Sequence, residues 1–519
     1  MTINERMSLP IWKKLILYSI SFIIFLIQFS FVILGFVVIF NVSNPERFAA
    51  FRYLYYIILG VSFCYILYIM AKPMLVSYKL TWIILIFLFP LPFCFLYTLN
   101  SMSRRTTGKK RKELINEARY NLEPGCLNEL ESFDSTAANM VKCVQKSTFA
   151  PVYNNCDVEF FTDIYEKFED IVDEVVKAKR YIFMDFFIVA PGYLMDTLYP
   201  ILLDKGRRGV EIKILYDSIG SGRVINHKFL KKLSMIPNCS ISNYEPIGMN
   251  ISLTINNRNH RKIFIIDGEV CYCGGDNLAD EYINKRNRFG HWRDNCAKYR
   301  GPIVNTFLFL FYQDWKTSTK TKFDLNKYAA PNKFYYNDIY RMAFGDGPLY
   351  YGNPAYDLFQ SMISSAKKTL YISTPYFIIN DGMLSLIALK IKEGIDVKIL
   401  MPGIPDKKTA YYMGRANYRP ILTAGGKIYE YTPGFNHAKN IIVDGKYLFT
   451  GTVNMDYRSL FLHYECGGLI INNDIAKKAE ADFLDAVEKS RLVTYYDWKR
   501  RPWYQKLLAF FLNILAPMF

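Results

Sequence analysis

The chain has 519 residues, of which 51% are hydrophobic and 16% aromatic, and its formal net charge is +17. This composition excludes a disordered chain, and the length leaves room for a membrane segment and two or three domains. A strongly basic protein is expected to bind an anionic partner, either nucleic acid or a phospholipid surface. The ten cysteines contain no C-x-x-C pair, so we expect free thiols in a reducing compartment rather than a zinc or disulfide framework.

Three apolar runs near the N-terminus, about 15–41, 54–71 and 80–98, are long enough or nearly long enough to cross a bilayer. We therefore expect residues 1–100 to form a membrane anchor with two or three transmembrane helices. The second run is short and rich in Tyr, and a re-entrant or interfacial segment is its alternative. Pro90 and Pro92 predict a kinked end for the third run.

Six cations follow the third run closely: Arg104, Arg105, Lys109, Lys110, Arg111 and Lys112. Because cytoplasmic flanks of membrane helices are enriched in Lys and Arg, we expect a multi-pass membrane protein whose remaining chain is cytoplasmic. Cations at the N-terminus, Arg6, Lys13 and Lys14, argue for the opposite orientation of the first run. The number of spans therefore stays open between two and three.

After a polar linker, expected over 101–150, the chain alternates strands with helices in two similar stretches. Strands are expected at 181–188 and 209–215, and again at 370–377 and 394–400. This repeat predicts two tandem α/β units, at 151–330 and 331–495, with largely parallel or mixed sheets that pack about a pseudo-twofold axis. A basic and apolar tail at 496–519 is expected either to lie in the membrane interface or to dock on the catalytic domain.

Each half contains the pattern His-x-Lys-x4-Asp, and this repetition is the most specific signal in the chain. The first copy is His260, Lys262 and Asp267, and the second is His437, Lys439 and Asp444. Each His is followed seventeen residues later by an Asn: Asn277 and Asn454. A single copy would be ordinary strand surface, but two matched copies in a chain with five histidines indicate a shared site.

The residue types suit phosphodiester chemistry that needs no metal or other cofactor. His and Lys two positions apart project from the same face of a strand. If the two halves face each other, the Lys and Asn side chains can hold the negative charge of the transition state, each donor contributing about 3–4 kcal/mol. One His can then attack phosphorus while the other protonates the departing alcohol.

The aspartates of the motifs belong to the candidate catalytic set, although their expected role is structural. Asp267-Gly268 and Asp444-Gly445 lie between apolar runs, which is a strong hairpin signal. A catalytic imidazole also needs an acidic partner to fix its tautomer. Asp294 and Glu465, which lie downstream of the two motifs, are the candidates for this orienting role.

The paired motifs resemble those of the phospholipase D superfamily, and more narrowly the bacterial cardiolipin synthases. The narrower resemblance covers nearly the whole chain from about residue 50 and is carried by the segments 258–262, 280–282, 292–294, 374–377 and 454–459. It implies phosphatidyl transfer between two phosphatidylglycerol molecules in the bacterial membrane. By this resemblance His260 is the nucleophile that forms a phosphatidyl-histidine, and His437 is the general acid and base. The phosphate would be held by Lys262, Asn277, Lys439 and Asn454.

Two features depart from the family pattern: an additional apolar N-terminal run, and Asp276 where an apolar residue usually precedes the Asn. A phospholipase D that uses water as acceptor, a nuclease of the same superfamily and a non-catalytic scaffold are the alternatives. The expected partners are phosphatidylglycerol and the membrane, and no nucleic acid is expected, because a nuclease gains nothing from a hydrophobic anchor. The sequence does not indicate the preferred acceptor alcohol or the oligomeric state.

Overall fold

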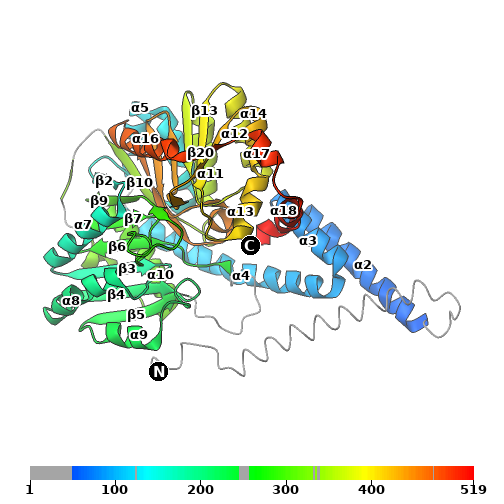
Figure 1. The fold of residues 1–519 in the computed structure, drawn as a ribbon. Helices are drawn as coiled ribbons and strands as arrows, with labels where there is room; N and C mark the ends of the chain where they lie inside the picture. The colour runs from blue at the N-terminus through cyan, green and yellow to red at the C-terminus, as the bar shows by residue number, and fades with distance from the viewer. Residues whose placement is uncertain are drawn as a thin grey trace. The chain divides into compact units, whose positions relative to one another are not determined.

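The computed structural model describes residues 49–122, 125–244, 256–330, 333–335, 339–471 and 473–518. The chain divides into two compact units (Figure 1). The smaller unit comprises the described residues of 1–108, 246–256 and 513–519, and the larger unit comprises those of 109–245 and 257–512. The apolar run expected at 15–41 lies outside the described residues.

Two mixed β-sheets form the centre of the larger unit. The first sheet has seven strands, in the spatial order β2 (Asp157–Phe161), β9 (Cys296–Arg300), β7 (Val270–Gly274), β6 (Lys262–Ile266), β3 (Tyr181–Phe186), β4 (Glu211–Asp217), β5 (Cys239–Tyr244). The second sheet has nine strands, in the order β1 (Val152–Tyr153), β10 (Tyr340–Asp346), β19 (Glu465–Ile471), β17 (Tyr447–Gly451), β16 (Asn440–Val443), β11 (Thr369–Ser373), β13 (Asp396–Pro402), β14 (Lys427–Tyr431), β20 (Ser490–Val493).

The two sheets repeat one topology. In each, three neighbouring strands run parallel, β3-β4-β5 in the first sheet and β11-β13-β14 in the second. The remaining strands of the common core pair antiparallel in the same order, so the seven strands from β10 to β14 match those of the first sheet, and β1 and β20 are added at the edges. The prediction of a mixed α/β repeat is confirmed.

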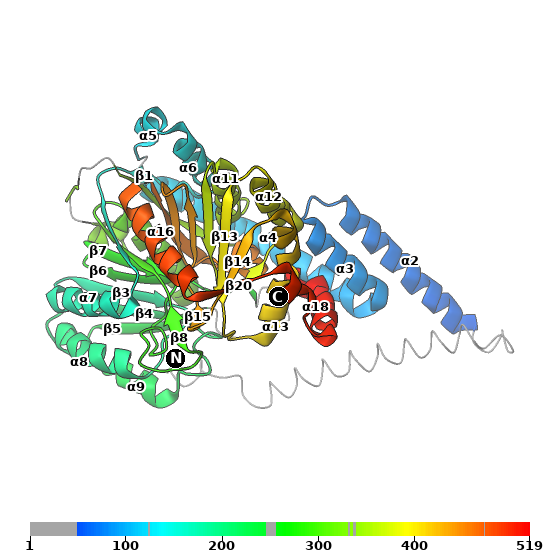
Figure 2. The same ribbon diagram turned by 45° about the horizontal axis from the view of Figure 1, so that its top comes forward.

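Helices cover the sheets in equivalent positions (Figures 1 and 2). They are α7 (Ile164–Lys177), α8 (Tyr193–Arg207), α9 (His227–Ser234) and α10 (Val304–Thr319) in the first half, and α11 (Pro354–Ser365), α12 (Asp381–Lys392), α13 (Lys408–Ala416), α14 (Tyr418–Ala424) and α16 (Asn473–Glu488) in the second. Their apolar residues recur at helical spacing; in α7 the side chains of Phe168, Ile171 and Val175 are buried on one face.

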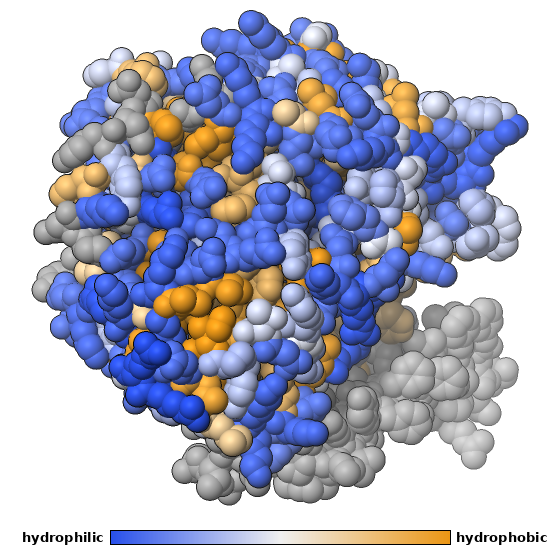
Figure 3. Space-filling model, turned by 60° about the vertical axis from the view of Figure 1, so that its left-hand side comes forward, coloured by the Kyte–Doolittle hydropathy of each residue, from blue (hydrophilic) through white to orange (hydrophobic). Residues whose placement is uncertain are grey.

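The helices α10 and α16 join the two halves, because each contacts strands of both sheets. Their aromatic residues stack in the same way: Phe311 of α10 lies 4.8 Å from Phe183 of β3, and Phe483 of α16 lies 5.1 Å from Tyr371 of β11, between ring centroids. All four side chains belong to one buried apolar cluster or pack against it. The outer face seen in Figure 3 is mostly hydrophilic, with smaller apolar patches.

Residues 101–150 do not form the polar linker that their composition predicts. The segment contains the end of α4 (Pro90–Asn121), α5 (Leu127–Phe133) and α6 (Ser135–Thr148). Asp134 caps α6 by accepting a hydrogen bond from Ala137 N at 3.0 Å. Val141 and Val144 are buried in the same apolar cluster as the second sheet, so α6 is part of the catalytic fold.

In the smaller unit, one described helix is long and apolar enough to cross a bilayer, the part of α2 (Ala49–Ala71) from Tyr53 to Ala71. The run expected at 80–98 is divided between α3 (Val76–Leu88) and the start of α4, because the chain breaks at Phe89 before Pro90. The expectation of several transmembrane helices is therefore not confirmed for the described residues.

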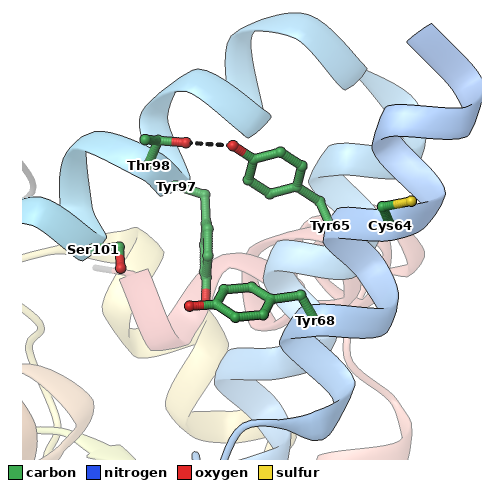
Figure 4. A pocket seen from close by; sticks show the side chains of 6 residues that line it. All are labelled: Cys64, Tyr65, Tyr68, Tyr97, Thr98 and Ser101. Carbon is green, nitrogen blue, oxygen red and sulfur yellow. Dashed lines mark hydrogen bonds between the residues drawn. The ribbon is translucent and has the colours of Figure 1, made fainter. Parts of the chain in front are cut away.

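The smaller unit has its own apolar core of Ile69, Trp82, Ile86 and Tyr97. Beside it is a cavity of about 310 Å³, lined by Cys64, Tyr65 and Tyr68 of α2 and by Tyr97, Thr98 and Ser101 of α4 (Figure 4). The C-terminal residues also pack here, since Thr81 Oγ1 donates a hydrogen bond to Ile514 O at 2.6 Å. The preceding turns of α18 (Trp503–Leu515) expose Trp503 and Phe510, so the tail combines a docked end with an exposed apolar surface.

Candidate active site

The two motif histidines lie just before equivalent central strands, and each is anchored by the opposite half. His260 precedes β6, and its backbone N donates to Tyr464 O at 2.8 Å. His437 precedes β16, and its backbone N donates to Arg293 O at 2.7 Å. The short strands β15 (Gly434–Asn436) and β8 (His291–Arg293) pair in parallel beside His437. A parallel bridge between Asn259 and Tyr464 occupies the equivalent place beside His260. This reciprocity is what a pseudo-twofold arrangement requires.

The imidazoles and carboxylates of the two halves are paired crosswise. His260 Nδ1 lies 2.9 Å from Glu465 Oε2, and His437 Nδ1 lies 2.6 Å from Asp294 Oδ2. Both carboxylates are buried. Each motif histidine therefore takes its acid from the half that does not contain it, a pairing that positions along the sequence could not indicate.

Each carboxylate is held by further donors. Thr452 Oγ1 and Ser459 Oγ both donate to Glu465, the latter at 2.7 Å, and Asn295 N donates to Asp294 Oδ1 at 3.0 Å. The sequence alone does not predict a role for these two hydroxyl residues. The only signal for Ser459 is its place in the segment 454–459, and Thr452 has no signal beyond lying next to Gly451.

The protonation states of the site follow from burial. Burial lowers the pKa of His260 to about 3 and places that of His437 well below its ordinary value, which favours the neutral form of both imidazoles. Burial raises the pKa of Asp294 to about 6. Burial would also raise the pKa of Glu465, but the adjacent His260 and the hydrogen bonds to this carboxylate lower it. A neutral imidazole that donates Nδ1–H to a carboxylate keeps the Nε2 lone pair available.

The motif lysines lie at the same centre. Lys262 Nζ donates to His260 O at 2.6 Å, and Lys439 Nζ donates to His437 O. Both side chains are buried, and burial lowers the pKa of Lys262 and brings that of Lys439 to about 7. The charge of Lys262 lowers the pKa values of His260, His437 and Lys439, so these motif side chains lie near one another.

The motif asparagines are buried after the strands that follow each lysine. Asn277 Oδ1 accepts a hydrogen bond from Ile188 N at 3.0 Å, and its Nδ2 donates to Tyr282 Oη at 2.6 Å. The Tyr282 ring lies 5.6 Å from the His437 ring, which places Asn277 close to the site. For Asn454 Oδ1, no hydrogen-bond partner occurs among the described residues.

Asp267 and Asp444 serve the fold rather than the imidazoles. Both have positive φ, 55° and 54°, in the turns after β6 and β16. Asp267 accepts hydrogen bonds from three successive backbone N–H groups at 179–181, and Asp444 does the same at 367–369. The two aspartates thus fix where β3 and β11 begin, in line with the structural role that the hairpin signal predicts for these members of the candidate catalytic set.

Aromatic rings border each imidazole. Trp292 and Phe435 lie 5.1 and 5.6 Å from His437, and Phe187 and His463 lie 5.0 and 5.4 Å from His260, between ring centroids. These neighbours were not identified as site residues from the sequence, since they precede or follow the motifs without a regular spacing. The apolar rings of Phe187, Trp292 and Phe435 limit the access of water to the two histidines.

Residues that flank His260 are themselves fixed by buried partners. Asn259 Nδ2 donates to Asp185 Oδ1 at 2.8 Å, and Arg261 forms an ion pair with Asp314 at 2.8 Å. Arg261 Nε also donates to Glu465 O at 3.2 Å, which links the two halves next to the acid of the first imidazole. The segment around His260 is therefore rigidly positioned.

Comparisons with known proteins agree with this geometry. The family model described as "Cardiolipin synthase, PLD-like domain" matches residues 171–288 and 359–487, one match in each half. A cardiolipin synthase of Geobacillus sp. (strain WCH70) is 30% identical over 89% of this chain and 93% of its own length. A cardiolipin synthase of Alkalihalophilus pseudofirmus is 31% identical over 85% of this chain and 88% of its own length.

Among solved structures, the phosphatidylserine synthase of Haemophilus influenzae has a similar fold. Its TM-score is 0.56 at 15% identity, covering 73% of this chain and all of that chain. At this identity the likeness concerns the fold alone.

Proposed function

Because the chain belongs to the cardiolipin synthase family of phospholipase D-like proteins and is a phosphatidyltransferase, we propose that it condenses two phosphatidylglycerol molecules into cardiolipin and releases glycerol. The observation that carries this proposal is the crossed pair of imidazole–carboxylate contacts, His260 with Glu465 and His437 with Asp294. One neutral imidazole that attacks and one protonated imidazole that gives a proton, beside two buried lysines, suit a phosphodiester that is attacked on one side and released on the other.

In the first step, His260 Nε2 attacks the phosphorus of one phosphatidylglycerol. The N–P bond forms and the bond from phosphorus to the glycerol oxygen breaks. His437 reacts in its protonated form, with Nδ1–H held by Asp294, and it gives its Nε2 proton to that oxygen and becomes neutral. Lys262, Lys439, Asn277 and Asn454 stabilise the negative charge on the non-bridging oxygens. The product is a phosphatidyl-histidine and free glycerol.

In the second step, a glycerol hydroxyl of another phosphatidylglycerol loses its proton to His437 Nε2 and attacks the same phosphorus. The new O–P bond forms as the N–P bond breaks, which restores His260. Limited access of water beside the rings of Phe187 and Trp292 favours transfer to a lipid over hydrolysis.

The difference between the two acids supports His260 as the nucleophile. Glu465 has a lowered pKa and stays ionised, which suits the partner of a histidine that carries positive charge as a phosphatidyl-histidine. Asp294 has a pKa of about 6, closer to neutral pH, and accompanies the histidine that gives and takes protons in our scheme. The motifs alone leave the two roles interchangeable.

The proposed location is the bacterial cell membrane, with the catalytic unit on the cytoplasmic side. The apolar α2 supports attachment to the membrane, and the run of cations at 104–112 together with the net charge of +17 supports contact with anionic lipid on the cytoplasmic face.

The test is a reaction of purified protein with labelled phosphatidylglycerol in mixed micelles containing a chelator. Cardiolipin and glycerol are expected in equal amounts, and His260→Ala and His437→Ala should each abolish both. An acid-labile lipid label on the denatured wild-type chain, absent from His260→Ala, would identify the phosphatidyl-histidine. Phosphatidic acid as the sole product would instead identify a hydrolytic phospholipase D, and cleavage of DNA without lipid turnover would identify a nuclease.

A further inference from the structure

Beside the proposed nucleophile, three side chains form a group with the composition of a transition-metal site. His260, His463 and Glu465 each offer one ligand atom, and these atoms all lie within 4.8 Å of one another. Glu465 is fully buried and each imidazole retains about 8% exposure, so the group lies at the edge of the buried interior. Two imidazoles and one carboxylate are a recurrent zinc ligand set, with water as the fourth ligand.

His463 has no part in the proposed transfer, and its surroundings leave a ligand atom free. Among the described residues, no side chain or backbone group makes a hydrogen bond with His463 Nδ1, although the side chain is buried. This nitrogen lies 3.6 Å from Glu465 Oε1, whereas His260 contacts the other carboxylate oxygen, Oε2. The carboxylate thus lies between two imidazole nitrogens, and that of His463 makes this 3.6 Å contact without a hydrogen bond to any described residue.

We propose that this group binds Zn²⁺, or a transition-metal ion of similar preference, and that the bound ion inhibits phosphatidyl transfer. Nitrogen and carboxylate ligands select such ions over Mg²⁺ and Ca²⁺, which prefer oxygen alone. Thr452 and Ser459, which already donate to Glu465, would orient this ligand as outer-shell partners of metal ligands do.

Metal binding should release one proton and inhibit phosphatidyl transfer. The His260 Nδ1–H that now faces Glu465 is replaced by the metal, and its proton is released to solvent. The imidazole then loses its carboxylate partner, and the metal withdraws electron density from Nε2, the proposed nucleophile. Lys262 and Lys439 oppose a dication at this position, so we expect a reversible site that a chelator empties.

The binding test uses Co²⁺ as a spectroscopic probe on the full chain in zwitterionic detergent, without anionic lipid that would itself bind metal. We expect visible absorption of a low-coordinate Co²⁺ that saturates at one ion per chain and is displaced by Zn²⁺. His463→Asn should weaken binding at least ~10-fold, because one of three protein ligands is lost. His291→Asn, in a histidine that contacts Tyr431 outside the group, is the matched control and should bind as wild type.

The activity test rests on the proposed function. Zn²⁺ should inhibit the wild type and a chelator should restore it, whereas His463→Asn should stay active and become insensitive. His463→Gln provides a second variant should Asn impair folding, and metal protection of His463 against an imidazole-modifying reagent, mapped by mass spectrometry, uses the wild type alone. Absence of saturable Co²⁺ binding, or equal binding by wild type and His463→Asn, would overturn the inference. Metal binding without any lipid turnover would reject the proposed function and leave the metal site standing.

Discussion

The acids that contact the two imidazoles differ in how readily they lose their charge, and this difference predicts how the rate depends on pH. Burial raises the pKa of Asp294 to about 6, so its carboxylate is protonated as the pH falls through that value. A protonated Asp294 no longer accepts the hydrogen bond that fixes the tautomer of His437.

We therefore expect kcat/KM to fall about tenfold per pH unit below about pH 6. This decrease can be measured from initial rates of cardiolipin formation between pH 5 and 8, with circular dichroism as the control for unfolding. A rate that stays flat down to pH 5 in a folded protein would show that Asp294 does not govern His437.

The charge of Lys439 gives a second prediction, with the opposite direction. Burial lowers the pKa of this side chain to about 7, so its positive charge is lost as the pH rises above neutrality. An anionic phosphodiester binds the charged form, and KM should therefore increase with pH between about 7 and 9.

The matched variant is Lys439→Arg, because a guanidinium keeps its charge throughout this range. It should bind lipid with a KM that hardly changes with pH, even where its kcat is lower than that of the wild type. Equal pH dependence of KM in the two proteins would assign the effect to another group.

At the scale of secondary-structure elements, the turns at Asp267 and Asp444 connect the two sides of each sheet. Each carboxylate accepts three backbone N–H groups at the start of a neighbouring strand. Asp267→Ala leaves these donors without their acceptor and should destabilise the fold by ~1–3 kcal/mol.

Asp267→Asn should cost less, since Asn retains one acceptor oxygen and tolerates positive φ. Thermal unfolding in detergent compares the two variants with wild type. The activity of the folded fraction should be close to that of the wild type for both, and a large loss of kcat without loss of stability would return Asp267 to the catalytic set.

The elements also show what the sequence could and could not predict. Apolar runs rich in β-branched and aromatic residues identified the strands β3, β4, β11 and β13, because central strands are buried on both faces. The segment 101–150 was misread because overall polarity hides the apolar face of α6, whose Val141 and Val144 are buried. The crossed acid pairs could not be predicted, since they depend on how two halves pack rather than on local spacing.

At the scale of the whole molecule, both imidazoles and both acids belong to one chain. Mixing His260→Ala with His437→Ala protein should therefore restore no activity, because neither chain contains a complete site. Products from co-purified mixtures of the two variants, carrying different affinity tags, provide the measurement. Recovery of activity would mean that the halves exchange between chains, and wild-type protein diluted with either variant controls for inhibition by mixing.

The exchange of acids between the halves also bears on how such a chain can change over generations. His260 depends on Glu465 and His437 depends on Asp294, so neither half holds a working imidazole of its own. A substitution that shifts one half by a fraction of an ångström changes the contact between its carboxylate and the histidine of the other half. The two halves should therefore evolve together, because substitutions that one half tolerates depend on the sequence of the other half.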